Sequence, residues 1–142
     1  MRSRRVLLFV VSLLTTTTIR AQDPDVGQTL QMIASFYESC ADVTDVQREG
    51  SSFRIYENNG AQSYLEFDLD DFNTPSKHDV IAILECSTGA CVHGYMADSM
   101  NPGSWKKYHS YASLTVVCDS DVEVKLTKLY RYYYRMLQQQ GG

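Results

Sequence analysis

Residues 80–96 read VIAILECSTGACVHGYM, and this stretch decides the fold that we predict for the chain. Its first arm, Val80–Leu84, is apolar throughout, which is typical of a strand in the middle of a sheet. A four-residue Ser-Thr-Gly-Ala loop follows, and its glycine, Gly89, can supply the positive φ that short loops often need. We therefore expect a central hairpin of two paired strands, closed by a disulfide between Cys86 and Cys91.

The first 21 residues have the pattern of a cleavable export signal. Three arginines precede the short apolar run Val6–Leu14, and Ala21 is a small residue where cleavage would fall. The apolar run is much shorter than the ~20 residues that cross a bilayer, so a permanent anchor is not expected. We predict a secreted or periplasmic protein that uses the general secretory route, because the twin-arginine pattern is incomplete. The expected parts are a signal peptide over 1–21, one domain over 22–138 and a disordered tail over 139–142.

The charge balance restricts the class of partner. The predicted mature chain, residues 22–142, holds nine Lys and Arg against 17 Asp and Glu, so its formal net charge is −8. Such an acidic chain is a poor binder of nucleic acid or of an anionic membrane. We therefore expect a protein or an anionic ligand as the partner, and no nucleic acid.

All four cysteines lie in the predicted mature chain, and an even number in an exported protein indicates two disulfides. Three pairings are possible, and we favour Cys86–Cys91 with Cys40–Cys118. Cys40 ends the apolar stripe of the first predicted helix, and Cys118 lies on the inward face of the last predicted strand. No Cys-x-x-Cys motif is present, and the spacing does not suit zinc. No metal or cofactor is expected.

Two amphipathic helices are predicted at the ends of the domain. Asp23-Pro24 is a typical helix start. The apolar stripe of the first helix consists of Val26, Leu30, Ile33, Tyr37 and Cys40. Ser120 and Glu123 form a possible capping box for the second helix. Its stripe consists of Val122, Leu126, Leu129, Tyr133 and either Met136 or Leu137.

Strand patterns fill the region between the helices. Ser52–Tyr56 and Ser63–Leu69 flank Asn58-Asn59-Gly60, a strong hairpin signal. Ser110–Cys118 is the last expected strand, Asp98–Tyr108 is expected to be a loop, and Val43–Gln47 fits a strand or a loop. This order predicts an α+β fold, with an antiparallel sheet of five or six strands flanked by an N-terminal and a C-terminal amphipathic helix. The alternative is a pleckstrin-homology-like barrel capped by the C-terminal helix.

Two surfaces are candidate binding sites. The C-terminal helix places Lys128, Arg131 and Arg135 opposite its apolar stripe. Tyr130 and Tyr132 are expected beside the stripe, and Tyr134 is expected to point further outward. The expected loop carries the only Trp of the chain, and its candidate binding residues are Trp105, Lys106, Lys107 and Tyr108. Tyrosine, tryptophan and arginine are the residues favoured at recognition surfaces. Basic residues late in a helix also complement its dipole, and a loop Trp can equally cover the end of a sheet.

Residues with catalytic chemistry are sparse. His78, His93 and His109 have no metal-ligand spacing, and no G-x-S-x-G motif is present. In the strand Ser63–Leu69 the apolar Leu65, Phe67 and Leu69 share the face expected to be covered. Glu66, Asp68 and Asp70 alternate with them on the wet face, a pattern that does not wrap a single cation. We expect a small, exported, non-catalytic binding domain. The alternatives are a hydrolase that uses a histidine and a carboxylate, and a secreted inhibitor that presents the loop Ser87–Ala90.

Overall fold

Helix α1 (Val26–Glu38) opens the fold. The computed structural model describes residues 22–58 and 60–141, so the predicted signal peptide lies outside the described residues. Asp25 is the helix N-cap, and it exchanges hydrogen bonds of 2.7 and 2.9 Å with Gln28 in a capping box. The N-cap is thus two residues later than the predicted Asp23. Of these two aspartates, only Asp25 is followed by a glutamine at the third position after it, as a capping box requires. The predicted stripe is confirmed, since Leu30, Ile33, Tyr37 and Cys40 are buried.

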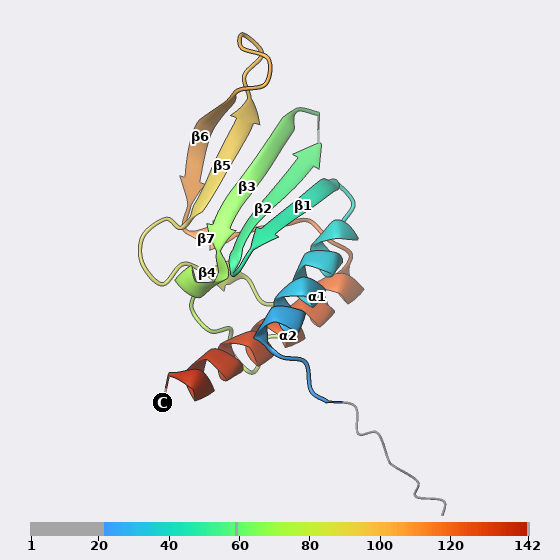
Figure 1. The fold of residues 1–142 in the computed structure, drawn as a ribbon, viewed down its shortest axis with the longest axis vertical. Helices are drawn as coiled ribbons and strands as arrows, with labels where there is room; N and C mark the ends of the chain where they lie inside the picture. The colour runs from blue at the N-terminus through green and yellow to red at the C-terminus, as the bar shows by residue number, and fades with distance from the viewer. Residues whose placement is uncertain (1–21, 59, 142) are drawn as a thin grey trace, which may run out of the picture.

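The main sheet has five antiparallel strands in the order β1-β2-β3-β5-β6 (Figure 1). Their bounds are Val43–Glu49, Ser52–Asn58, Gln62–Asp68, Val92–Ala97 and Trp105–Tyr111. The predicted α+β class and the antiparallel sheet are confirmed, and β2 and β3 form the expected hairpin. The alternative barrel is wrong, because the sheet stays open with β1 and β6 at its edges.

The expected central hairpin is wrong, although its disulfide is present. The first arm forms only the short strand β4 (Leu84–Glu85), which pairs with β7 (Ser113–Leu114) in a separate two-stranded sheet. The second arm is β5, which pairs with β3 and β6. Residues 80–83 lie along α2 (Ser120–Gln140) instead of inside a sheet, and the Ala82 N–H donates to Thr127 Oγ1 at 2.9 Å. The apolar run is therefore attached to a helix at Ala82 and is not paired in a sheet.

The last strands also differ from the prediction. The region Asp98–Tyr108 is not a loop throughout, because β6 begins at Trp105. The predicted strand Ser110–Cys118 is divided between the end of β6 and the two-residue β7, with Ala112 between them exposed. The chain changes sheets at this point, so the period-2 pattern of Ala112, Leu114, Val116 and Cys118 does not correspond to one strand.

Helix α2 is longer and its buried face is wider than predicted. Asp119 is its N-cap and Ser120 its first residue, so the predicted Ser120–Glu123 capping box does not form. The helix extends to Gln140, into the region expected to be a tail. Tyr130 and Tyr134 are buried, although they were expected beside and outside the stripe. Their hydroxyls have buried partners that the periodicity cannot show, and Tyr134 donates to the Leu69 carbonyl at 2.6 Å.

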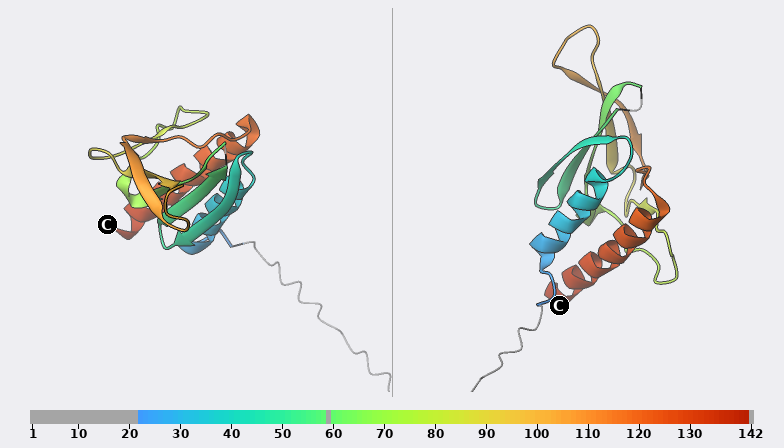
Figure 2. Two further views of the ribbon diagram at one scale, coloured as in Figure 1. Left: turned by 90° about the horizontal axis from the view of Figure 1, so that it is seen from above. Right: turned by 90° about the vertical axis from the view of Figure 1, so that its right-hand side faces the viewer.

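Both helices lie at one end of the sheet, and the β5–β6 connection projects from the other end (Figures 1 and 2). Helix α1 covers one sheet face through the contact of Tyr37 with Phe53 and Phe67. Helix α2 packs on α1 and on the short 3-10 helix η1 (Leu69–Asp71). The Tyr133 hydroxyl of α2 donates a hydrogen bond to the Asp70 carboxylate of η1. The opposite face of the sheet carries neither helix.

Both predicted disulfides are confirmed, Cys40–Cys118 and Cys86–Cys91. The first joins the end of α1 to the segment before α2, and the second closes the turn between β4 and β5. Two disulfides indicate an oxidising, extracytoplasmic compartment. Within the described ranges, no helix combines the length and apolar character that crossing a bilayer requires.

Removing the disulfides one at a time should give unequal losses of stability. Cys40 and Cys118 are 78 residues apart, whereas Cys86 and Cys91 are five apart. By chain entropy the longer loop contributes about 4–5 kcal/mol to the free energy of unfolding and the shorter about 2 kcal/mol. Urea denaturation of C40A/C118A and C86A/C91A checks this order. Equal losses would contradict it.

Four buried tyrosines should make the fold sensitive to alkali. Burial raises the pKa of Tyr37, Tyr130, Tyr133 and Tyr134 above the usual value of 10.0. Because the unfolded chain loses these protons first, their contribution is complete below pH 10 and falls as the pH rises above it. We expect phenolate absorbance of these residues to appear together with loss of the far-ultraviolet helix signal. Ionisation of these four tyrosines, beyond the phenolate signal of the other six in the chain, while the helix signal stays complete would contradict this expectation.

Candidate functional site

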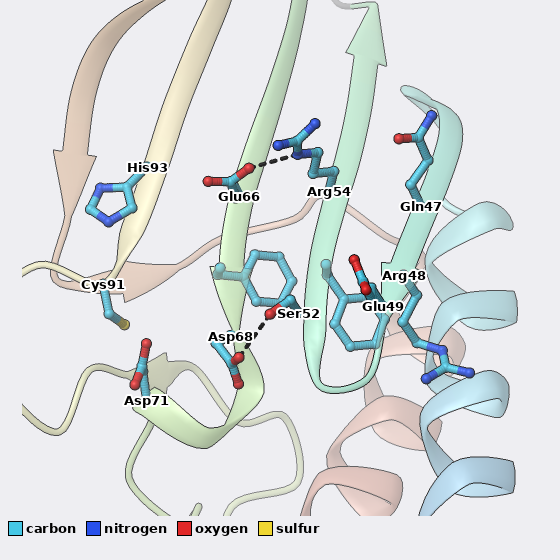
Figure 3. Close-up of a pocket in the computed structure, with 12 residues that line it drawn as sticks. Gln47, Arg48, Glu49, Ser52, Arg54, Glu66, Asp68, Asp71, Cys91 and His93 are labelled. Carbon is cyan, nitrogen blue, oxygen red and sulfur yellow. Dashed lines mark hydrogen bonds and ion pairs between the residues drawn. The ribbon is translucent and has the colours of Figure 1, made fainter.

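The sheet face that carries neither helix presents a line of polar side chains, one from each of four strands. In the β-ladder Arg54 is opposite Glu66, Glu66 is opposite His93, and His93 is opposite Ser110. Directly opposed residues of antiparallel strands point to the same face. The register therefore places these four side chains in a row across β2, β3, β5 and β6, and Figure 3 shows the first three of them. We call this surface the open face.

Arg54 connects the polar row to neighbouring aromatic residues. Its Nε lies 2.6 Å from Glu66 Oε2, and its guanidinium lies 5.5 Å from the centre of the Tyr64 ring. The hydrogen bond and the charge of Glu66 raise the pKa of Arg54. Half of the Arg54 side chain is exposed, so the ion pair adds less than about 1 kcal/mol to stability. Arg54 is thus held in place but remains accessible to a ligand.

His93 and Ser110 form the second pair of the row. Nδ1 of His93 lies 2.8 Å from the Ser110 Oγ, and both residues are half-buried. Glu66 is the next residue in the row, but its carboxylate is bound to Arg54. The row therefore brings a hydroxyl and an imidazole together, while the nearby acid is held by a different partner.

Asp68 adds a carboxylate at the lower end of the open face. It accepts hydrogen bonds from the Ser52 hydroxyl at 2.8 Å and from the Asp70 N–H at 2.9 Å. Burial alone would raise the pKa of Asp68, but the hydrogen bonds together lower it. Asp68 is therefore a fixed negative charge.

An aromatic cluster lies beside the polar row. The Tyr64 ring stacks on Tyr95 at 4.7 Å between centres. It also packs edge-on with Trp105 at 4.9 Å and at a tilt with Tyr56 at 5.1 Å. Tyr64 is only 7% exposed, although it points away from the main core. Trp105 keeps 37% of its surface exposed. The cluster is thus a second, small apolar centre with an accessible Trp at its border.

The open face is hollowed at two places. A shallow pocket of about 600 Å³ lies over β1, β2 and β3 (Figure 3). Its lining includes Gln47, Glu49, Ser52, Arg54, Glu66, Asp68 and His93. A smaller hollow of about 380 Å³ lies beside Trp105 and Tyr56. Both hollows have mixed polar and apolar walls, which suits a partner that forms hydrogen bonds as well as apolar contacts.

The residues expected near Trp105 are divided between the two sheet faces. Trp105 and Lys107 belong to the open face, since Lys107 is opposite Tyr95 in the ladder. Lys106 forms a 3.2 Å ion pair with Asp98. Tyr108 lies against Gly94, where an added Cβ would be 2.7 Å from its ring, so Gly94 makes room for this tyrosine. Only part of the predicted surface is therefore continuous.

The basic residues of α2 are separate from the open face. Lys128 and Arg135 are exposed. Arg131 donates to the backbone carbonyls of Ser76 and Asp79, so it holds the chain segment before β4. Strand β6 begins at the end of the sheet away from α2 (Figure 1), so the structure does not bring the two groups of predicted binding residues together. A binding role for the residues of α2 stays a prediction.

Sequence reasoning missed most of the open face. Glu66 and Asp68 were expected on a wet strand face, but their partners Arg54 and Ser52 were not identified. The Asn-Gly hairpin signal contains this information, because a tight hairpin fixes which residues of its two strands are opposite each other. Asp70 does not join the row, since its carboxylate accepts the Tyr133 hydroxyl.

The remaining candidates are dispersed. His78 and His109 are exposed, and His109 lies 4.6 Å from the Tyr111 ring. The loop Ser87–Ala90 is exposed, and Ser87 is fixed by two hydrogen bonds to the Asp71 carbonyl. In the part of the chain that the structure describes, no three His, Cys, Asp or Glu residues are grouped as metal ligands. Comparisons with protein-family models, curated proteins and solved structures find no match to this chain.

Proposed function

We propose that this protein is a small, exported, non-catalytic binding domain that recognises a protein partner with the open face of its sheet. The single observation that carries the proposal is the Tyr56–Tyr64–Trp105 cluster next to the accessible Arg54. Tyrosine, tryptophan and arginine dominate the energy of protein interfaces when they lie together on a surface.

The charges of the open face support a polar protein partner. Glu66, Asp68 and Arg54 are fixed by hydrogen bonds, so little conformational entropy is lost when a partner binds them. Acidic side chains outnumber basic ones in the large pocket, which favours a partner with exposed lysine or arginine. The two disulfides support a role in an oxidising compartment.

A quantitative pull-down from the native extracellular fraction tests this proposal. R54A and Y56A/W105A should each reduce recovery of a specific partner at least tenfold, because they remove the central contacts of the open face. R54A separates binding from folding, because an exposed ion pair contributes little to stability. The matched control is K128E/R135E, which changes exposed residues of α2 and should recover the same partner. Loss of the partner only in K128E/R135E would refute the open face and support the basic helix surface.

A hydrolase is the second candidate, and the contact between His93 and Ser110 is the observation that favours it. Such an enzyme needs the histidine to activate the hydroxyl and an acid to orient the histidine. Because Glu66 is bound to Arg54, we expect a fluorophosphonate probe to leave Ser110 unlabelled. Labelling of Ser110 that disappears in H93A would replace the binding proposal with a hydrolase.

A further inference from the structure

A third cavity, besides the two hollows of the open face, opens where β4 and β7 separate. The two strands pair at only two positions, Leu84 with Leu114 and Glu85 with Ser113. Beyond these pairs, a cavity of about 320 Å³ lies between residues 81–84 and residues 114–116. Cavities of this size hold small organic ligands in other proteins. It is separate from the open face, since the two share no lining residue.

The walls and rim of this cavity are aliphatic. Ile81 and Ile83 form one wall, and Leu114 and Val116 form the other. Ile83 is 67% exposed, and the neighbouring Val80 and Val117 are 69% and 65% exposed. Val80 and Val117 each directly adjoin a lining residue in the sequence, so exposed aliphatic side chains flank both walls of the cavity. The rim is therefore suited to the hydrocarbon part of a ligand.

The floor of the cavity carries a polar group that is not fully used. Tyr37 and Tyr130 line it, and their hydroxyls form a hydrogen bond with each other. The two side chains are 1% and 5% exposed. Two hydroxyls carry two protons, and their mutual bond uses only one. Among the described residues neither hydroxyl has another hydrogen-bond partner, so one buried donor has no acceptor. A buried donor without an acceptor costs free energy that a suitable ligand atom would recover.

The wall formed by residues 81–83 is held in position by α2. Thr127 accepts the Ala82 N–H, and Arg131 binds the carbonyls of Ser76 and Asp79 a few residues earlier. The cavity is thus preformed, which favours binding of a small ligand. Arg131 therefore helps to hold this wall in place, whereas the sequence analysis expected it to contact a ligand.

We propose that this cavity binds a small neutral aliphatic molecule that carries one carbonyl-type acceptor, such as a medium-chain ketone or ester. The acceptor receives the free tyrosine proton at the floor, and the hydrocarbon chain lies between the aliphatic walls. A fatty acid fits less well, because Glu123 lines the same cavity and would repel its carboxylate. This site is independent of the open face.

Titration calorimetry of the folded, disulfide-bonded chain with 2-nonanone tests the proposal. We expect saturable binding of one molecule, and binding of nonanoic acid at neutral pH at least tenfold weaker. T115W places a large side chain in the wall and should weaken 2-nonanone binding at least tenfold. The matched control is T88W, an exposed threonine in the loop of the Cys86–Cys91 disulfide, and it should bind as the unchanged protein does.

The role of the two hydroxyls needs a variant that preserves the cavity. Y37F/Y130F keeps both rings and removes both hydroxyls, and it should weaken 2-nonanone binding about tenfold. Retained cooperative melting shows that the double variant still folds, and Y130F alone provides a milder version. Absence of saturable binding to the unchanged protein would overturn the proposal and leave a cavity that holds only water. Equal binding by T115W, or by Y37F/Y130F, would overturn it as well.

Discussion

The fold depends on the position of Tyr37, because this side chain contacts all three parts of the core. Its ring packs edge-on against Phe53 and Phe67 of the sheet, and its hydroxyl bonds to Tyr130 of α2. The Cys40–Cys118 disulfide lies three residues further along the chain and fixes the same end of α1 to the start of α2. A packed ring thus holds α1 on one sheet face, and a buried hydrogen bond and a covalent bond hold α2 against α1.

The open face follows from this arrangement. Because both helices are engaged with one another at one end of the sheet, neither can cover its second face. That face still needs internal contacts, since an open antiparallel sheet gains stability from its cross-strand pairs. Arg54 with Glu66 and Tyr64 with Tyr95 supply them. The same contacts leave Arg54 and Trp105 accessible, so the features that complete the sheet also form the proposed recognition surface.

The sequence predicts the features that depend on local periodicity. The stripe of α1, the β2–β3 hairpin and the inward Leu65 and Phe67 are confirmed because each pattern reflects one element against one core. Both disulfides are also confirmed, although Cys86–Cys91 closes a turn between two sheets and not a hairpin. The prediction that Tyr134 points outward was wrong. Its hydroxyl is buried with a partner distant in the sequence, the Leu69 carbonyl. Such partners depend on tertiary structure, so the spacing of apolar residues in the sequence does not show them.

Residues 80–84 show why an apolar run does not specify a location. Four to eight consecutive apolar residues fit a buried strand, and the neighbouring cysteines favoured that assignment. A central strand would, however, need ladder partners along its length, and of this run only Leu84 belongs to a strand. Thr127 instead accepts the Ala82 N–H, and Arg131 binds the Asp79 carbonyl just before the run, while Val80 and Ile83 stay exposed. Because these contacts hold exposed aliphatic residues beside an unused tyrosine donor, the run that resembles sheet interior is better explained as the wall of a binding cavity.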